Sequence, residues 1–289
     1  MKQYNAGMRP DLSTVALRPN ERLQYWRRRD LGDATLMRAR YGPFTWEKHV
    51  HDEQVIVISE DGAGEVNTRR GRDVGVPGSI WAFMPGEYHF GRVQEGGRWD
   101  YCALYLDDAV LRRLGEQLGY GENTRLLIRP GLHQDHELAS ILLHAHTLQS
   151  DVAAEEAAWS EALDLLFTRY GDPRPSKTTA LSAGSAGLNL TREYIAEHFR
   201  DDISVDDLAG LANVSRFHFI RAFRTAFGMP PHAYINQVRL QNARKLLLAG
   251  HSVGLAAGDS GFYDQSRLSH LFKRAYGVTP ARYAHLASL

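Results

Sequence analysis

Two stretches of this chain, SRFHFIRAFRTAFGMPPHAY (residues 215–234) and DQSRLSHLFKRAYGVTPARY (264–283), decide how its C-terminal part folds. They align without a gap at a constant offset of 49 positions, with Ser215 on Asp264. Apolar residues fall on apolar residues, and glycine and proline fall on their own kind: Phe219 on Leu268, Phe223 on Phe272, Gly228 on Gly277 and Pro231 on Pro280. A repeat at fixed spacing indicates one supersecondary unit used twice.

Each copy predicts a helix of about three turns with one apolar stripe. The stripe of the first copy consists of Phe219, Ala222, Phe223, Ala226 and Phe227. That of the second consists of Leu268, Leu271, Phe272, Ala275 and Tyr276. Ser215 and Asp264 suit the N-cap, because a short oxygen side chain accepts from early amide groups. Gly228 and Gly277 suit the left-handed position that ends a helix.

A shorter helix is predicted before each of these long ones. Ser204 can cap a helix over 205–211, and Ser252 can cap one over 253–260. Two helices joined by a tight turn form a helix-turn-helix, whose second helix reads DNA in the major groove.

The outward faces of the two long helices carry the candidate DNA contacts. The first face holds Arg216, Phe217, Ile220, Arg221 and Arg224. The second holds Gln265, Ser266, Ser269, His270 and Lys273. Arginine pairs with guanine, glutamine with adenine, and lysine neutralises phosphate. A charged helix face is usually only solvated, but two copies in register favour DNA binding.

These residues match a known family. The stretch 188–286 resembles the C-terminal DNA-binding domain of AraC/XylS-type transcription regulators. The matching text is ISVDDLA (203–209), NVSRFHFIRAFRTAFGMPPHAYI (213–235), VRLQNARKLLL (238–248) and GFYDQSRLSHLFKRAYGVTPARY (261–283). The resemblance implies two helix-turn-helix units that are joined by a long helix over about 231–249 and enter successive major grooves. It also implies groove contacts by Arg216, Phe217, Ile220 and Arg221, and by Gln265, Ser266, Ser269 and His270.

Composition and charge agree with this interpretation. A length of 289 residues suggests two domains, and 43% hydrophobic and 24% charged residues are ordinary for a globular protein. The net charge is zero, but from Ala186 onward 12 basic residues outnumber 8 acidic ones. That excess of +4 predicts a basic surface where phosphates would lie.

The sequence also indicates where in the cell the protein is expected. It shows no apolar run long enough to span a membrane and no secretion signal, and its single cysteine, Cys102, fits a reducing compartment as a buried, inert thiol. We therefore expect a cytoplasmic protein without membrane contact.

The stretch at 171–187 is rich in Pro, Gly and Ser, which predicts a linker between two domains. The expected domains are 1–172 for ligand sensing and dimerisation, 173–187 for the linker, and 188–289 for DNA binding.

The N-terminal domain shows short β-type runs followed by helical stretches. QVIVIS (54–59), SIWAFM (79–84) and YCALYL (101–106) are separated by turn signals, which predicts a sandwich or barrel. Helices are predicted over about 108–118, 135–149 and 153–170, and they are the candidate dimerisation elements. The expected fold is therefore multidomain α+β, with a β-barrel domain, dimerisation helices, and an all-α domain with two helix-turn-helix units.

HVHDE (49–53) and PGEYH (85–89) are similar to the two motifs of cupins, which are jelly-roll barrels. The glutamate that usually binds metal after the second histidine is absent, which leaves His49, His51 and His89, with Glu53 or Glu87 as substitutes. Three roles stay open: binding a divalent metal, contacting a ligand, or packing. Ligand contact is favoured, and no metal or cofactor is assigned. The candidate ligand-binding residues are His49, His51, Glu53, Trp81, Glu87 and His89; further candidates for the pocket wall are Trp46, Phe83, Tyr88 and Trp99.

The sequence thus predicts a ligand-responsive, sequence-specific transcription regulator without enzymatic activity. Its expected partners are double-stranded DNA, a small-molecule effector and a second copy of the chain. Two alternatives remain: a cupin-type metalloenzyme fused to a DNA-binding module, and a constitutive DNA-binding protein whose barrel only supports dimerisation.

Overall fold

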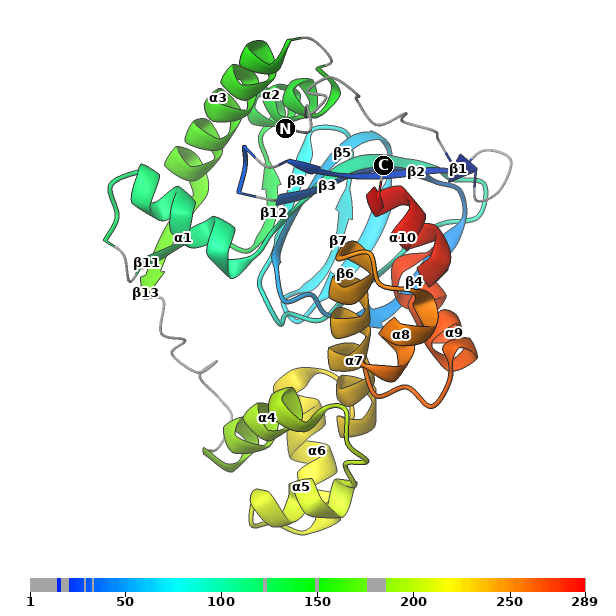
Figure 1. The fold of residues 1–289 in the computed structure, drawn as a ribbon. Coiled ribbons are helices and arrows are strands. Elements are labelled where there is room, and N and C mark those ends of the chain that lie inside the picture. The colour runs from blue at the N-terminus through cyan, green and yellow to red at the C-terminus, as the bar shows by residue number, and fades with distance from the viewer. Residues whose placement is uncertain are drawn as a thin grey trace, which may run out of the picture.

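The computed structural model describes residues 15–16, 21–28, 30–32, 34–121, 124–148, 151–175 and 186–288. A β-rich N-terminal domain, which we call the sensor domain after its expected role, is followed by a helical domain that extends below it in Figure 1. The predicted multidomain α+β fold is confirmed. Among the described residues, none of the helices combines the length and the apolar character that a membrane crossing requires.

The strands of the sensor domain form two main sheets and one short one, all with antiparallel pairing. The seven-stranded sheet has the order β1 (Val15–Ala16), β2 (Arg22–Arg28), β3 (Ala34–Tyr41), β10 (Trp99–Leu106), β5 (Gln54–Gly62), β8 (Ser79–Phe83) and β12 (Gly131–Gln134). The four-stranded sheet has the order β4 (Phe44–His49), β9 (His89–Val93), β6 (Gly64–Thr68) and β7 (Gly71–Gly75). The short sheet pairs β11 (Thr124–Ile128) with β13 (Gly171–Pro175).

The central strands of the large sheet are buried on both faces. In β10, Tyr101 and Ala103 point into the core between the two main sheets, whereas Cys102 and Leu104 point to the opposite side. This alternation follows from the two-residue period of a strand. Cys102 is a buried free cysteine, as predicted, and burial raises the pKa of its thiol to about 12, which disfavours the reactive thiolate.

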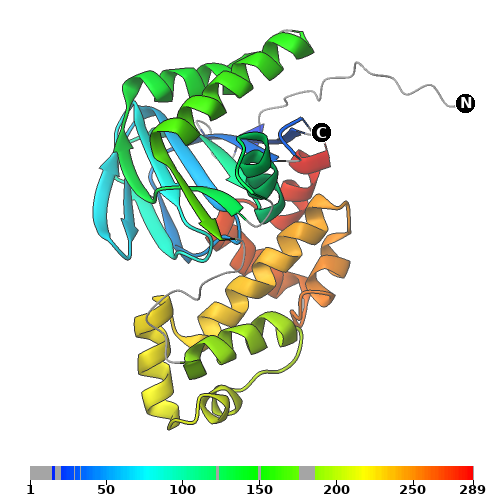
Figure 2. The same cartoon turned by 90° about the vertical axis from the view of Figure 1, so that its left-hand side faces the viewer.

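Three helices cover the outer face of the large sheet. They are α1 (Asp108–Gln117), α2 (His136–Thr147) and α3 (Val152–Tyr170), and Figure 2 shows α2 and α3 lying across the top of the strands. Their buried residues join Ile56, Ile58 and Leu104 of the sheet in one apolar cluster. The three helices were predicted to within about two residues; 149 and 150 lie outside the described residues.

His146 on α2 is a buried histidine in an apolar site. Neither of its ring nitrogens has a hydrogen-bond partner among the described residues, and its ring lies edge-on to Trp26 and Trp159. Burial lowers its pKa to about 3. Histidine in the unfolded chain has a pKa of about 6.5. Between this pH and about 3, the unfolded chain therefore binds a proton at His146 and the folded chain does not.

We expect this histidine to make the protein less stable as the pH falls from about 6.5 towards 3. The slope is about 1.4 kcal/mol per pH unit, so the loss from this group is about 2 kcal/mol at pH 5. Urea unfolding of the parent and of His146→Leu at pH 8 and pH 5 measures it. The variant should lose about 2 kcal/mol less than the parent between these pH values, and the exposed control His251→Leu should not differ from the parent. Equal losses in the parent and His146→Leu would contradict the low pKa.

The helical domain contains two helix-turn-helix units joined by a long helix. Its elements are α4 (Ala186–His198), α5 (Val205–Leu211), α6 (Arg216–Phe227), α7 (Pro231–Leu248), α8 (Val253–Gly258), α9 (Gln265–Tyr276) and α10 (Pro280–Ser288). Ser215 and Asp264 cap α6 and α9 through their side chains, as predicted. Gly228 and Gly277 end these helices with φ of 75° and 77°, a region that favours glycine.

The two units differ in where their apolar stripes are buried. The first unit has a core of its own, in which Phe219 and Phe223 of α6 pack with α4, α5 and α7. The second unit continues the core of the sensor domain, because Phe272 and Tyr276 of α9 and Tyr283 of α10 belong to the same cluster as Tyr25 and Tyr101. Figures 1 and 2 show α9 and α10 beside the strands and α4 to α6 further away.

The predicted domain limits at 172/173 and 187/188 stay a prediction. Residues 176–185, the middle of the predicted linker, lie outside the described residues.

Candidate functional site: a chamber between the sensor domain and the second recognition helix

The two main sheets enclose a chamber that α9 closes at one end. Its volume is about 80 Å³. The strands contribute aromatic and aliphatic side chains to its wall, among them Tyr25, Met37, Tyr41, Trp46, Phe83, Trp99, Tyr101 and Tyr105. Helix α9 contributes Ala275 and Tyr276. No Asp, Glu, Lys or Arg lines the chamber within the described part of the chain, so its wall carries no fixed charge.

Strand alternation explains why these aromatic residues converge. Tyr101 and Tyr105 are separated by an even number of residues on β10, so their side chains lie on the same face of the strand. The same holds for Met37 and Tyr41 on β3. Burial raises the pKa of Tyr101 and Tyr105 above the ordinary range of tyrosine. These side chains therefore remain neutral and can donate a hydrogen bond to a bound molecule.

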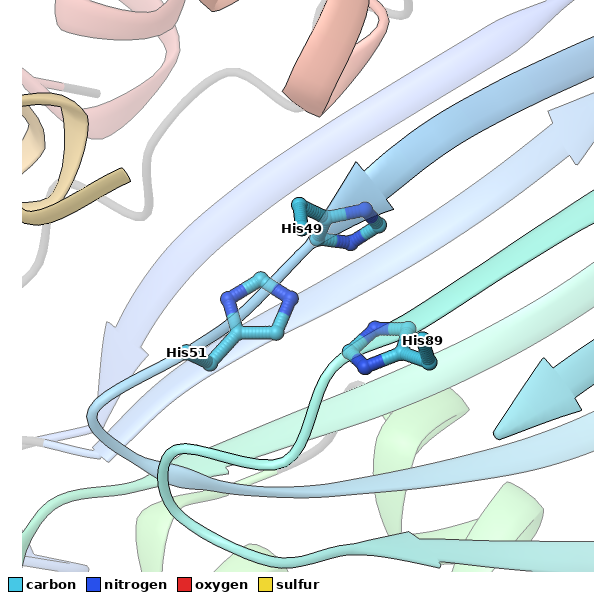
Figure 3. Close-up of side chains that lie close together, drawn as sticks. All are labelled: His49, His51 and His89. Carbon is cyan, nitrogen blue, oxygen red and sulfur yellow. The ribbon is translucent and has the colours of Figure 1, made fainter. Parts of the chain in front are cut away.

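Three histidines form the polar corner of the chamber (Figure 3). His49 ends β4 and His89 begins β9, and the two are direct partners in the register of these strands. His51 follows in the loop between β4 and β5. One ring nitrogen of each lies within 4.8 Å of the others, and the three side chains are 6%, 5% and 8% exposed.

Hydrogen bonds and burial determine the state of these rings. Nδ1 of His49 donates to the Glu47 carbonyl over 2.7 Å, and Nδ1 of His89 donates to the Glu87 carbonyl over 3.3 Å. Nδ1 of His51 is buried and has no hydrogen-bond partner in the described residues. Burial lowers the pKa of all three, and neighbouring imidazoles lower the pKa of His51 and His89 further. The cluster is therefore neutral at physiological pH.

Polar contacts fasten the helical domain over this end of the sensor domain. Arg244 of α7 forms a buried ion pair with Glu53, in which the two residues are 2% and 9% exposed. The neighbouring Lys245 pairs with Asp52 over 2.7 Å at the surface. Arg274 of α9 pairs with Glu47 of β4.

Backbone carbonyls of the sensor domain and of the first unit take part as well. Gln241 donates to the Val50 carbonyl over 3.1 Å, and Lys48 donates to the Gly228 carbonyl over 2.9 Å. The loop that carries His51 is thus held by side chains of α7, so a shift of the loop also disturbs the helical domain.

The structure brings only part of the predicted ligand site together. His49, His51 and His89 line the chamber, as do Trp46, Phe83 and Trp99. Trp81 does not line the chamber, because its ring stacks on Phe83 outside the lining. Glu53 and Glu87 are also outside it, because ion pairs with Arg244 and Arg70 hold their carboxylates. Tyr88 instead lies under the Lys48 ammonium group.

The predicted DNA contacts lie on the open faces of α6 and α9. Ile220 and Ser269 are half-buried and the others are exposed, with Phe217 at 80%. Arg216 pairs with Asp206 of α5 over 2.6 Å at the surface. The exposed Tyr263, just before the N-cap of α9, extends this face, although the sequence patterns did not single it out.

The chain is similar to two protein families over separate ranges. Residues 31–167 match the family of AraC-like ligand binding domains. Residues 208–285 match a family of helix-turn-helix domains.

Individual relatives agree with both matches. The uncharacterized HTH-type transcriptional regulator YbfI of Bacillus subtilis is 28% identical over 228 residues, which cover 76% of this chain and 80% of YbfI. The MmsAB operon regulatory protein of Pseudomonas aeruginosa is 26% identical over 244 residues, which cover 81% and 75%. Other relatives match over a shorter range: the probable transcriptional regulator LumQ of Photobacterium leiognathi is 34% identical over 32% of this chain and 38% of LumQ.

The fold of the whole chain is also similar to a solved structure. ToxT from Vibrio cholerae superimposes with a TM-score of 0.53 at 14% identity, over 88% of this chain and 98% of ToxT. The order of a β-rich domain and a helical domain with two helix-turn-helix units is therefore shared.

Proposed function

Because this chain belongs to the AraC/XylS family of ligand-binding, DNA-binding transcription regulators, we propose that a molecule in its chamber controls how α9 engages DNA. One observation carries this proposal: Ala275 and Tyr276 of the second recognition helix are part of the chamber wall. A ligand in the chamber therefore contacts α9, the second recognition helix. Allostery requires that the ligand bind two states unequally, and the position of α9 supplies these states.

The size of the chamber supports this coupling. At about 80 Å³ it is smaller than the roughly 300–1,000 Å³ of most small-molecule pockets, so a larger ligand must displace part of the wall. The strands are fixed to one another by backbone hydrogen bonds. The α9 side of the wall is held by side-chain contacts alone, such as that between Arg274 and Glu47. Helix α9 is therefore the part of the wall that yields.

The lining indicates the chemistry of the effector. Aromatic rings and aliphatic groups suit an apolar body, while the histidine corner and the tyrosine hydroxyls suit one or two polar groups. ToxT, which shares this fold, has been solved with an unsaturated fatty acid bound. We propose for this chain a small, mostly apolar effector with a polar head directed at His49, His51 and His89.

A thermal-shift screen of metabolites against the full chain tests this function. A ligand that binds only the folded state at 100 times its Kd stabilises it by about 2.7 kcal/mol. Val66→Phe, which adds bulk to the chamber wall, is the matched control. A compound that stabilises the parent but not this variant binds in the chamber. A compound that stabilises both binds elsewhere, for example in the groove of about 490 Å³ between α1 and α3, and would contradict the proposal.

For DNA, we propose base and backbone contacts by the exposed faces of α6 and α9. Arg221→Ala is expected to weaken binding to a duplex selected from a random pool by about 1–3 kcal/mol, because a bidentate contact to a base edge is lost. Binding to unselected DNA should change little. Electrophoretic titration of both duplexes measures the effect, and Arg98→Ala, which removes a half-exposed arginine from the sensor domain away from α1, α2 and α3, is the control. An equal loss on both duplexes would exclude a base-reading role for Arg221.

We further propose that the chain acts as a cytoplasmic homodimer through α1, α2 and α3, without a catalytic step. The support is the family membership and the position of these helices on the outside of the sensor domain, away from α6. Sedimentation of the full chain at micromolar concentration tests the dimer, and a monomer there would refute it. Chemical turnover of a chamber ligand by the purified chain would refute the non-enzymatic role.

A further inference from the structure

We propose that the sensor domain takes part in the DNA interface: Lys48 and Arg69, together with Arg224 of α6, bind the phosphate backbone beside the groove that α6 reads. Lys48 lies on β4, and Arg69 lies in the turn of the β6–β7 hairpin. The inference rests on the DNA contacts proposed above for α6 and extends them to a domain without a helix-turn-helix. The partner is the backbone of double-stranded DNA, independent of its base sequence.

The sensor domain holds the C-terminal end of α6 by three contacts. Nζ of Lys48 donates to the Gly228 carbonyl over 2.9 Å, and Nη1 of Arg69 donates to the Ala226 carbonyl over 3.4 Å. The ring of Tyr88 packs so closely on Gly228 that a side chain at this glycine would overlap it. Figure 2 shows α6, in yellow, below the strands of the sensor domain. Two cations of the sensor domain therefore lie beside the last turn of the first recognition helix.

Three cations gather at this end of α6 without a carboxylate partner. Lys48, Arg69 and Arg224 form no ion pair among the described residues. Arg224 is exposed in the last turn of α6, and Arg69 is exposed in its hairpin. Burial and the positive charge of Arg224 lower the pKa of Lys48, which shows that the two cations repel each other. An anion bound between them would relieve this repulsion.

The neighbouring arginines of the hairpin differ in this respect. Arg70 pairs with Glu87 over 2.6 Å, and Arg72 pairs with Glu65 over 2.8 Å. Arg69, which contacts α6, has no such partner in the described part of the chain. The hairpin therefore leaves its positive charge unpaired at the position next to the recognition helix.

Capping of α6 explains only part of this arrangement. A cation near the C-terminus of a helix stabilises it, because the last carbonyl groups carry partial negative charge. A guanidinium group has five donor hydrogens and an ammonium group has three, and the contacts with α6 use one of each. These two side-chain groups form no other hydrogen bond within the described residues. Their remaining donors are available to phosphate oxygens.

The C-terminal turn of a recognition helix is a suitable place for such contacts. The recognition helix of a helix-turn-helix lies in the major groove with its N-terminal residues at the base edges, and in a homeodomain its C-terminal end contacts the backbone. We therefore expect the last turn of α6 at the rim of the groove, where a phosphate strand passes. Phosphate contacts position a protein on the duplex without reading its sequence, so these cations should add affinity and not specificity.

Electrophoretic titration of the full chain at several salt concentrations tests the proposal. The probes are a duplex selected from a random pool and an unselected duplex. For Arg69→Ala, the plot of log affinity against log salt concentration should be less steep by about 0.9 on both duplexes, because one counterion fewer is released. At about 0.1 M salt this corresponds to an affinity lower by about eightfold. Lys48→Met, which keeps an apolar side chain over the ring of Tyr88, should have the same effect.

Two further variants of the hairpin are the controls. Arg69→Lys keeps the positive charge and should keep the slope of the parent. Arg72→Ala removes an arginine that Glu65 already neutralises, so its slope and affinity should also equal those of the parent. The melting temperature of each variant, followed by tryptophan fluorescence, checks that it is folded.

A slope for Arg69→Ala equal to that of the parent would overturn the proposal, and a lower melting temperature would then show that Arg69 only caps α6. Equal changes of slope in Arg69→Ala and Arg72→Ala would overturn it too, since net charge alone would explain both. A parent that still prefers its selected duplex in either case shows that the proposed function stands and that only the contact by the sensor domain has failed.

Discussion

Replacing Arg244 with methionine is expected to lower the free energy of unfolding by about 3–5 kcal/mol, because the change leaves the Glu53 carboxylate buried without its partner. Arg244 comes from α7 and Glu53 from the loop before β5, so this ion pair joins the helical domain to the sensor domain. The arginine also lies over the ring of Tyr105 at 5.4 Å from its centroid. The effect therefore reports whether the two domains are docked in solution.

Chemical denaturation of a double-mutant cycle measures this effect. Arg244→Met with Glu53→Gln should recover most of the loss, since the buried charge is then gone as well. Lys245→Met is the control from the same interface: Lys245 and Asp52 are 58% and 47% exposed, and such a pair contributes about 0–1 kcal/mol. If Arg244→Met cost no more than Lys245→Met, Glu53 would be hydrated and the domains would be apart.

Phe272→Ala is expected to destabilise the sensor domain together with α9, whereas Phe223→Ala should affect the first helix-turn-helix unit only. The two phenylalanines are equivalent in the repeat and both are fully buried. Truncation of either should cost about 3–5 kcal/mol of packing. Phe272 lies in the core that continues from the chamber, and Phe223 lies in the separate core of the first unit.

The distribution of tryptophan makes the difference measurable. All five tryptophans, at positions 26, 46, 81, 99 and 159, precede the helical domain. In thermal or urea unfolding their fluorescence should show a lower midpoint for Phe272→Ala and an unchanged midpoint for Phe223→Ala. Circular dichroism should detect the loss of helix in both. A fluorescence midpoint that falls equally in the two variants would show that both units share one core with the sensor domain.

The sequence predicted the local features of the fold well because local signals determine them. The caps at Ser215 and Asp264, the glycines at 228 and 277 and the two apolar stripes all follow from short-range rules. The same stripe that marks Tyr276 as buried could not show what covers it. Its repeat counterpart Phe227 stays within the first unit, while Tyr276 reaches the chamber, and this difference arises only from domain docking.

The candidate site was predicted in part for a similar reason. The resemblance of HVHDE (49–53) and PGEYH (85–89) to the two cupin motifs implied a common site for His49, His51 and His89, and the structure places the three rings together. Trp81 and Glu53 could not be placed, because a strand residue and an acidic residue are equally consistent with a pocket, a core or an ion pair. The two-residue period of a strand could have identified the tyrosines at 25, 101 and 105 as residues of one face. The Arg244–Glu53 pair spans 191 positions of sequence, so no local signal predicts it.

The most direct test of the coupling between chamber and DNA is to enlarge Ala275, which lines the chamber from α9. Ala275→Met adds bulk where a ligand would press on the helix, and Ala226→Met makes the same change at the repeat counterpart on α6, outside the chamber. On a duplex selected from a random pool by the parent protein, we predict that Ala275→Met changes the affinity by about 5–150-fold, the usual range of allosteric coupling, and that Ala226→Met leaves it within about twofold. Equal affinities of a folded Ala275→Met variant and the parent would contradict control of DNA binding from the chamber.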